Sequence, residues 1–156
     1  MVNIPSRNEI KGFSDRTRKN LAFIEQEYKD GANVHVVTQV TLSLFGIIAF
    51  PFDKYEALKT VLYQKPVETL MGVGWVKQVV KLDASSKHSP TITINDLCYH
   101  LRNALAHGRI TFSNDSRELS DLIITFEDVK WRAEITGPEA KKFCLKFLDF
   151  AYEKVA

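Results

Sequence analysis

The chain has 156 residues, of which 45% are hydrophobic and 26% are charged, and its formal net charge is +2. This length suits one typical domain with a hydrophobic core, and the net charge is too small to indicate nucleic-acid binding by itself. We therefore expect a single domain over residues 1–156, without extended disorder.

The cysteines and the apolar segments favour a cytoplasmic protein without a membrane anchor. Cys98 and Cys144 each lie among apolar residues of a predicted helix, so we expect reduced thiols, with a disulfide between them as the less favoured alternative. Residues 1–19 lack the apolar segment of a signal peptide. The longest apolar run, residues 34–52, has several polar interruptions, whereas a membrane span needs about 20 mostly apolar residues.

Two helices are predicted in the first third of the chain. The first covers residues 14–30, with Ser14 as its N-cap and Gly31 as its stop. The second covers residues 33–50 and ends before Pro51, because the residue preceding a proline disfavours helical geometry. Apolar residues surround most of this second helix, so we expect it to be buried.

The middle of the chain is less regular. A third helix is predicted over residues 53–64, with Asp53 as its N-cap. Residues 67–82 are ambiguous, because two glycines indicate a bend and the apolar residues from Trp75 onward indicate a short helix. The polar, serine-rich segment 83–90 is predicted to be a loop.

The next helix has a start signal and a stop signal. Thr93 suits an N-cap, and Asp96 follows three residues later, where an acidic side chain favours the N-terminal dipole. The helix is predicted to run to His107, and Gly108 ends it.

The periodicity changes after this helix. Residues 109–113, 122–126 and 130–135 have the alternation or β-propensity of short antiparallel strands. Residues 136–139 read as a capping box that opens the last helix. That helix is predicted to bury Phe143, Cys144, Phe147, Leu148 and Ala151. We therefore expect a mainly α fold, a helical bundle with a small antiparallel β insertion between its last two helices.

The helix over residues 93–107 carries a polar face. Asp96, His100 and His107 fall within about 60° of Asn103 on a helical wheel, and Leu97, Cys98, Leu101 and Leu105 lie on the opposite, core-facing side. Imidazole is the side chain suited to proton transfer near neutral pH. A histidine at a helix end can also be a simple cap, but the combination of polar residues on one face favours a site.

Arg102 lies at the edge of this face, about 100° from Asn103, and its length allows it to share a ligand with His107. The candidate catalytic residues are Arg102, Asn103 and His107, and the candidate binding residues are Tyr99, His100 and Arg109. We predict no cofactor and no metal. Asp96 and His107 are separated by about 16 Å along the helix axis, which is too far for one ion.

The segment Leu101–Gly108 resembles the signature of the HEPN family, which is an Arg, four to six residues and then a His, often with a polar residue directly after the Arg. Arg102, Asn103 and His107 match these three positions. The β segment after the motif resembles a branch of the family first named from a plasmid-encoded protein. HEPN toxins paired with a nucleotidyltransferase antitoxin often carry a Tyr two residues after the His, whereas this chain has Arg109, which argues against that pairing.

The resemblance implies a helical bundle that dimerises so that two motifs form one cleft. It implies a metal-independent endoribonuclease of a toxin–antitoxin, phage-defence or RNA-processing system. His107 would then be the general acid or base, and Arg102 would stabilise the phosphate. RNA, a second copy of the chain and an antitoxin or defence partner are the expected partners. The alternatives are a non-catalytic module that binds RNA, a nucleotide or a partner protein, and a helical dimer with an assembly role.

Overall fold

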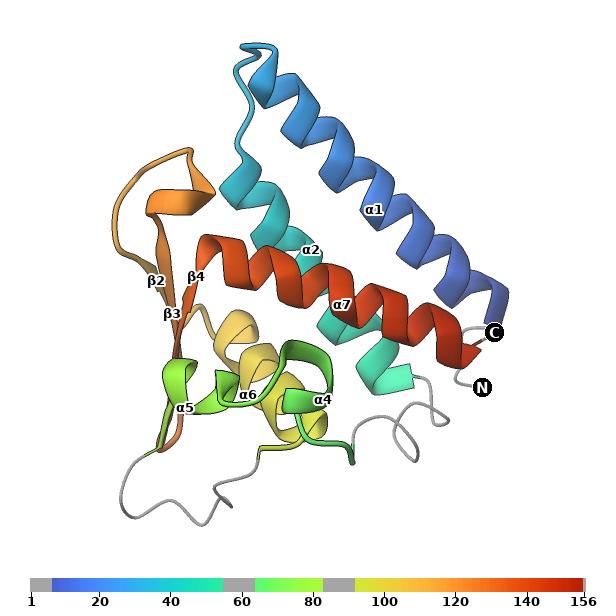
Figure 1. Ribbon diagram of the computed structural model, residues 1–156, viewed down its shortest axis with the longest axis vertical. Helices are drawn as coiled ribbons and strands as arrows, with labels where there is room; N and C mark the ends of the chain where they lie inside the picture. Colours follow the sequence, from blue (N-terminus) through green and yellow to red (C-terminus); the bar gives the residue numbers. More distant parts are fainter. Residues whose placement is uncertain (1–6, 55–63, 83–91, 156) are drawn as a thin grey trace.

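The computed structural model describes residues 7–54, 64–82 and 92–155, and helices predominate in these segments (Figure 1). The helices are α1 (Arg7–Lys29), α2 (Val36–Lys54), α4 (Glu68–Met71), α5 (Trp75–Val79), α6 (Ile94–Ala106) and α7 (Gly137–Val155). The strands are β1 (Val80–Leu82), β2 (Ile110–Phe112), β3 (Ile123–Asp128) and β4 (Trp131–Thr136), and a 3-10 turn, η1 (Leu119–Asp121), precedes β3. The expected mainly α fold with a small antiparallel sheet is confirmed.

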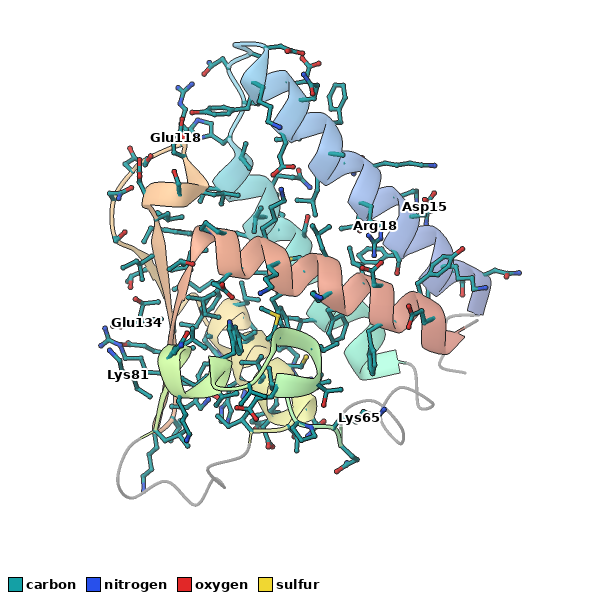
Figure 2. The ribbon with its side chains drawn as sticks, in the orientation of Figure 1. Asp15, Arg18, Lys65, Lys81, Glu118 and Glu134 are labelled. Carbon is teal, nitrogen blue, oxygen red and sulfur yellow. The ribbon has the colours of Figure 1, made fainter. Side chains whose placement is uncertain are left out.

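The long helices α1, α2 and α7 pack against one another, and the sheet lies at one end of α7 (Figure 1). The sheet order is β1-β4-β3-β2, and all its neighbours are antiparallel. Two ion pairs join α1 to α7, one between Arg18 and Asp149 and one between Lys141 and Glu25. Figure 2 shows Arg18 on the side of α1 that is close to α7.

The core lies between these helices and continues to the inner face of the sheet. The side chains that were predicted to be buried by the last helix are confirmed as buried, namely Phe143, Cys144, Phe147, Leu148 and Ala151. Helix α6 contacts α2 and β3, with Leu97, Leu101 and Phe126 fully buried. Because α6 is held from two sides by apolar contacts, the position of its polar residues is well defined.

The predicted start of the first helix is wrong. Helix α1 begins at Arg7, so Ser14 lies inside it and is buried rather than serving as the N-cap. The additional turns place Ile10 in the core with no exposed surface. The predicted stop is confirmed, because Gly31 has a φ of 87° and the chain closes a Schellman motif through hydrogen bonds from Gly31 N–H to Tyr28 O and from Ala32 N–H to Glu27 O.

The predicted boundary between the second and third helices is also wrong. Helix α2 continues through Pro51 to Lys54, although a proline inside a helix removes one hydrogen bond and crowds the carbonyl of the preceding turn. Asp53 therefore lies inside α2 and does not begin a new helix. Residues 55–63 of the predicted third helix and the whole predicted loop over residues 83–90 fall outside the described residues. The short helix from Trp75 is confirmed as α5, but β1, which follows it directly, was not predicted.

Both cysteines are free and buried, so the alternative of a disulfide is wrong. Burial raises the pKa of both the Cys98 and the Cys144 thiol. No helix within the described segments combines the length and the apolar content that a membrane span requires.

A close approach of backbone to backbone fixes the start of α7. A Cβ added to Gly137 would lie 2.2 Å from the carbonyl oxygen of Leu119 in η1, while Gly137 N–H donates to Leu122 O at 2.9 Å. Only half of the expected capping box forms. Thr136 Oγ1 accepts from Glu139 N–H at 3.3 Å, but the Glu139 carboxylate accepts from Trp75 Nε1 at 2.7 Å instead.

We expect Gly137→Ala to lower the free energy of unfolding by about 1–3 kcal/mol, because the new methyl group has to displace backbone rather than a flexible side chain. Urea denaturation followed by circular dichroism measures this change. Gly12→Ala is the matched control, since its Cβ would meet only the far end of the Arg16 side chain, at 3.0 Å. The control should be neutral or stabilising because alanine favours a helix, and equal midpoints for the wild type and Gly137→Ala would contradict the steric argument.

Candidate functional site

The polar face lies on α6, and the start of this helix is fixed by the capping box that the sequence predicts. Asp96 N–H donates to Thr93 Oγ1 at 3.1 Å, and Thr93 N–H donates to Asp96 Oδ2 at 3.2 Å. Both side chains are thereby engaged in capping. Asp96 acts at the end of α6 that is remote from His107.

The other end of α6 is fixed by a Schellman motif. His107 is the C-cap residue, Gly108 has a φ of 64°, and Gly108 N–H donates to Leu105 O at 3.2 Å. Arg109 N–H donates to Ala104 O at 2.8 Å, and Arg109 O accepts from Glu127 N–H on β3 at 3.0 Å. The backbone on both sides of His107 is therefore anchored, and Arg109 connects the helix to the sheet.

Four side chains on α6 and directly after it lie at or near the surface. His107 is exposed, and the Arg109 side chain is 51% exposed. Tyr99 is 46% exposed, and the Arg102 guanidinium lies over its ring at 5.6 Å from the centroid. This distance fits a cation–π interaction, so the Arg102 side chain lies along the helix surface towards Tyr99. The Arg102 guanidinium, the Tyr99 ring and the His107 imidazole thus lie on the side of α6 that is not packed in the core.

Asp128, which the sequence reasoning missed, joins this surface to the sheet. It is the last residue of β3, and its side chain is only 8% exposed. Its Oδ2 lies 2.9 Å from His100 Nδ1 and 3.1 Å from Asn103 Nδ2, and its Oδ1 lies 3.9 Å from Arg109 Nη1. One carboxylate therefore gathers two residues of α6 and the residue that follows the helix end.

Burial and hydrogen bonding act in opposite directions on this carboxyl group. Burial is the largest single influence and raises the pKa of Asp128, but hydrogen bonds from His100, Asn103 and the backbone N–H of Val129 together outweigh it and lower the pKa below its usual value. Asp128 is therefore ionised near neutral pH. An ionised carboxylate only accepts hydrogen bonds, so His100 Nδ1 and Asn103 Nδ2 are the donors.

The helical wheel predicted that His100 shares an open face with Asn103 and His107, but the structure shows that His100 is covered. It is only 4% exposed, and its ring stacks on that of Trp131 at a centroid distance of 4.8 Å with 12° between the ring planes. The polar stripe of α6 faces the end of the β3–β4 hairpin at this point, so the sheet covers His100. The described segments contain no group of three His, Cys, Asp or Glu side chains arranged to hold a metal ion.

The basic residues of α1 lie outside this site. Arg18 pairs with Asp149, and Lys19 pairs with Asp15 at 2.8 Å. These pairs fit a solvated helix face rather than a phosphate-binding surface.

The stability of the protein should depend on pH through Asp128. Because its pKa is lower in the folded chain than in the unfolded chain, its contribution is fully present above about pH 4 and is lost as the pH falls through the folded pKa. We expect Asp128→Asn to reduce the free energy of unfolding by about 1.5–3 kcal/mol at pH 7, since the lost bonds involve a charged acceptor. The difference from the wild type should shrink below pH 4, which urea titrations between pH 2.5 and 7 measure.

Glu127→Gln is the control for this prediction. Glu127 precedes Asp128 on the same strand, but its side chain is 57% exposed and pairs with Arg132 at 3.5 Å. Exposed pairs of this kind contribute about 0–1 kcal/mol. A pH-independent difference between Asp128→Asn and the wild type, or an equal effect of Glu127→Gln, would disprove the role of the Asp128 charge.

A family comparison matches almost the whole chain. Residues 3–156 match the family described as HEPN pEK499 p136. No curated protein and no solved structure matches the chain. The family match includes α6 with the Arg102–His107 motif, the sheet and the final helix. The resemblance seen in the sequence is confirmed, and this protein belongs to the HEPN pEK499 p136 family.

Proposed function

We propose that this protein is a metal-independent endoribonuclease that acts in the cytoplasm as a homodimer, in a toxin–antitoxin or phage-defence setting. One observation carries the proposal. His107 is exposed at the anchored C-terminal end of α6, and Arg102 and Asn103 lie on the last turns of the same helix. An accessible imidazole and a guanidinium on the same helix supply the two kinds of group that phosphodiester cleavage by proton transfer uses, and the Arg102 side chain, which lies towards Tyr99, has to turn towards His107 when RNA binds.

The proposed reaction is attack of the ribose 2′-OH on the adjacent phosphate. His107 removes the 2′-OH proton or gives a proton to the leaving 5′-oxygen. Arg102 donates charge-assisted hydrogen bonds to the phosphate oxygens, where negative charge develops. The 2′-oxygen–phosphorus bond forms as the bond to the 5′-oxygen breaks, which leaves a 2′,3′-cyclic phosphate. DNA lacks the 2′-OH and is not a substrate.

Dimerisation supplies the second proton-transfer group. The reaction needs one base and one acid, but the other histidine of α6, His100, is buried and engaged with Asp128. A second copy of His107, contributed by the partner subunit across a shared cleft, provides the missing group. In this proposal the dimer completes the site, and Arg109, whose side chain is half exposed, binds phosphate at the edge of the same cleft.

We expect His107→Ala to lower the rate of RNA cleavage about 10²–10⁴-fold, because general acid–base catalysis contributes this much. Cleavage of labelled total RNA, with and without a chelator, measures the effect. The mass of the protein in solution and its circular dichroism spectrum show whether folding and dimerisation stay intact.

His35→Ala is the matched control, since His35 is an exposed histidine next to α2 and away from the motif. It should cleave RNA at the wild-type rate. If His107→Ala retains the wild-type rate, the catalytic assignment is wrong.

The second candidate function is RNA binding without cleavage, and the Tyr99–Arg102 pair favours it. The Tyr99 ring is exposed, and the Arg102 guanidinium lies next to it. An unpaired base can stack on such an aromatic surface while the guanidinium forms an ion pair with a phosphate. This function needs neither His107 nor proton transfer.

We expect Tyr99→Leu to weaken the binding of single-stranded RNA roughly tenfold, because base stacking on an aromatic side chain contributes about 1–3 kcal/mol. Fluorescence anisotropy at several salt concentrations measures the dissociation constant. Tyr152→Leu is the control, since Tyr152 is also exposed and has Lys11 over its ring at 5.2 Å, but it lies on α7. Equal binding by Tyr99→Leu and the wild type would exclude Tyr99 from the RNA surface.

A further inference from the structure

Asp128 lies outside the motif but contacts it directly. Its carboxylate accepts a hydrogen bond from Asn103, the residue directly after Arg102, and its other oxygen faces Arg109. The turn that follows, at Val129 and Lys130, contains a non-glycine residue with positive φ, since Lys130 has a φ of 55°. Asp128 therefore lies at a tightly constrained hairpin end that points at the C-terminal half of α6.

The bond to Asp128 fixes the orientation of the Asn103 amide. Because the ionised carboxylate only accepts, the amide must turn its NH₂ group to Asp128, at 3.1 Å. The Oδ1 atom, on the other branch of the planar amide, is then turned away from Asp128. With the amide in this orientation, Asn103 presents a hydrogen-bond acceptor on the side away from the sheet.

His107 follows Asn103 by one helical turn. The two residues are four apart, and His107 N–H donates to Asn103 O at 3.0 Å, so the helical spacing persists to the cap residue. Side chains at this spacing are neighbours on a helix surface. A histidine ring that donates from one nitrogen to a fixed acceptor is held in one tautomer, with its other nitrogen available as a base.

We propose that Asp128 is a positioning residue for His107, acting through Asn103. Asp128 holds the Asn103 amide so that Oδ1 accepts a hydrogen bond from one ring N–H of His107, and it holds Arg109 beside the same surface. The inference rests on the proposed ribonuclease function for its catalytic consequence, whereas the bond between Asn103 and Asp128 is a property of the protein alone. In this role Asn103 orients His107 rather than binding a phosphate oxygen through Oδ1, because both the phosphate oxygen and Oδ1 are acceptors.

Nuclear magnetic resonance tests the chain of contacts without any substrate. The side-chain amide signals of Asn103, assigned with Asn103→Ala, should move as the pH falls, with a midpoint below the usual Asp pKa of about 3.9. The ring ¹⁵N shifts of His107 near pH 8 should show one dominant tautomer in the wild type. Asp128→Asn and Asn103→Ala should both return His107 to a mixture of tautomers, whereas Glu127→Gln should leave it unchanged. Unchanged His107 ring shifts in Asn103→Ala would overturn the inference.

Kinetics then separate the inference from the proposed function. We expect Asp128→Asn to lower kcat for RNA cleavage roughly 10–100-fold with little change in KM, because a small displacement of a catalytic group costs this much. Asp128→Glu, which keeps the carboxylate, should recover part of the loss, and Glu127→Gln should cleave as the wild type does.

If His107→Ala abolishes cleavage but Asp128→Asn retains the full kcat, the positioning role is wrong and the ribonuclease proposal stands. If His107→Ala has no effect on cleavage, the ribonuclease proposal fails, and the tautomer measurement alone decides the inference. If Asp128→Asn does not fold, the His107 ring shifts of Asn103→Ala decide the inference.

Discussion

Burying a carboxylate costs free energy unless hydrogen-bond donors surround it, and Asp128 meets this condition where the sheet contacts α6. His100 and Asn103 supply donors from the helix, and the hairpin supplies the backbone N–H of Val129. None of these partners is easily replaced, because removing one would leave a buried polar group unsatisfied. The contact between the end of β3 and α6 is thus determined by a few polar atoms, while the surrounding apolar contacts allow more variation.

The small sheet contributes to the candidate site because it supplies the buried carboxylate of Asp128. Asp128, at the end of β3, contacts the polar face of α6. Trp131, the first residue of β4 after the hairpin turn, covers the His100 ring. The chain leaves α6 through Gly108 and enters the sheet at once through Arg109. The side of the sheet away from the helices carries its own polar cluster, with Lys81 and Arg132 each 2.7 Å from Glu134 (Figure 2). Lys81, Arg132 and Glu134 thus form ion pairs within the sheet, whereas the Asp128 carboxylate accepts a hydrogen bond from Asn103 of the motif.

Features encoded by neighbouring residues were predictable from the sequence, and features that depend on distant residues were not. The Thr93–Asp96 cap, the stop at Gly108 and the buried side of α7 follow from spacing within one helix. Asp128 could not be predicted, because it lies 25 residues from Asn103 and nothing in a hairpin sequence indicates which helix it faces. The error at His100 has the same cause, since a helical wheel separates polar from apolar sides but does not show that a sheet covers part of the polar side. Strand β1 was missed because it follows α5 directly, and the apolar residues from Trp75 onward indicated only a short helix.

We propose that an imidazole and a guanidinium at the end of α6 cut RNA through its own 2′-OH. The chemical ends of the products distinguish this mechanism from other routes of RNA cleavage. Mass spectrometry of a short RNA after incubation with the protein should find a 2′,3′-cyclic phosphate on one fragment and a 5′-OH on the other. The same RNA with a single 2′-deoxyribose at the cleaved position should stay intact. Fragments with a 5′-phosphate and a 3′-OH, or cleavage of the deoxy-substituted strand, would contradict the mechanism.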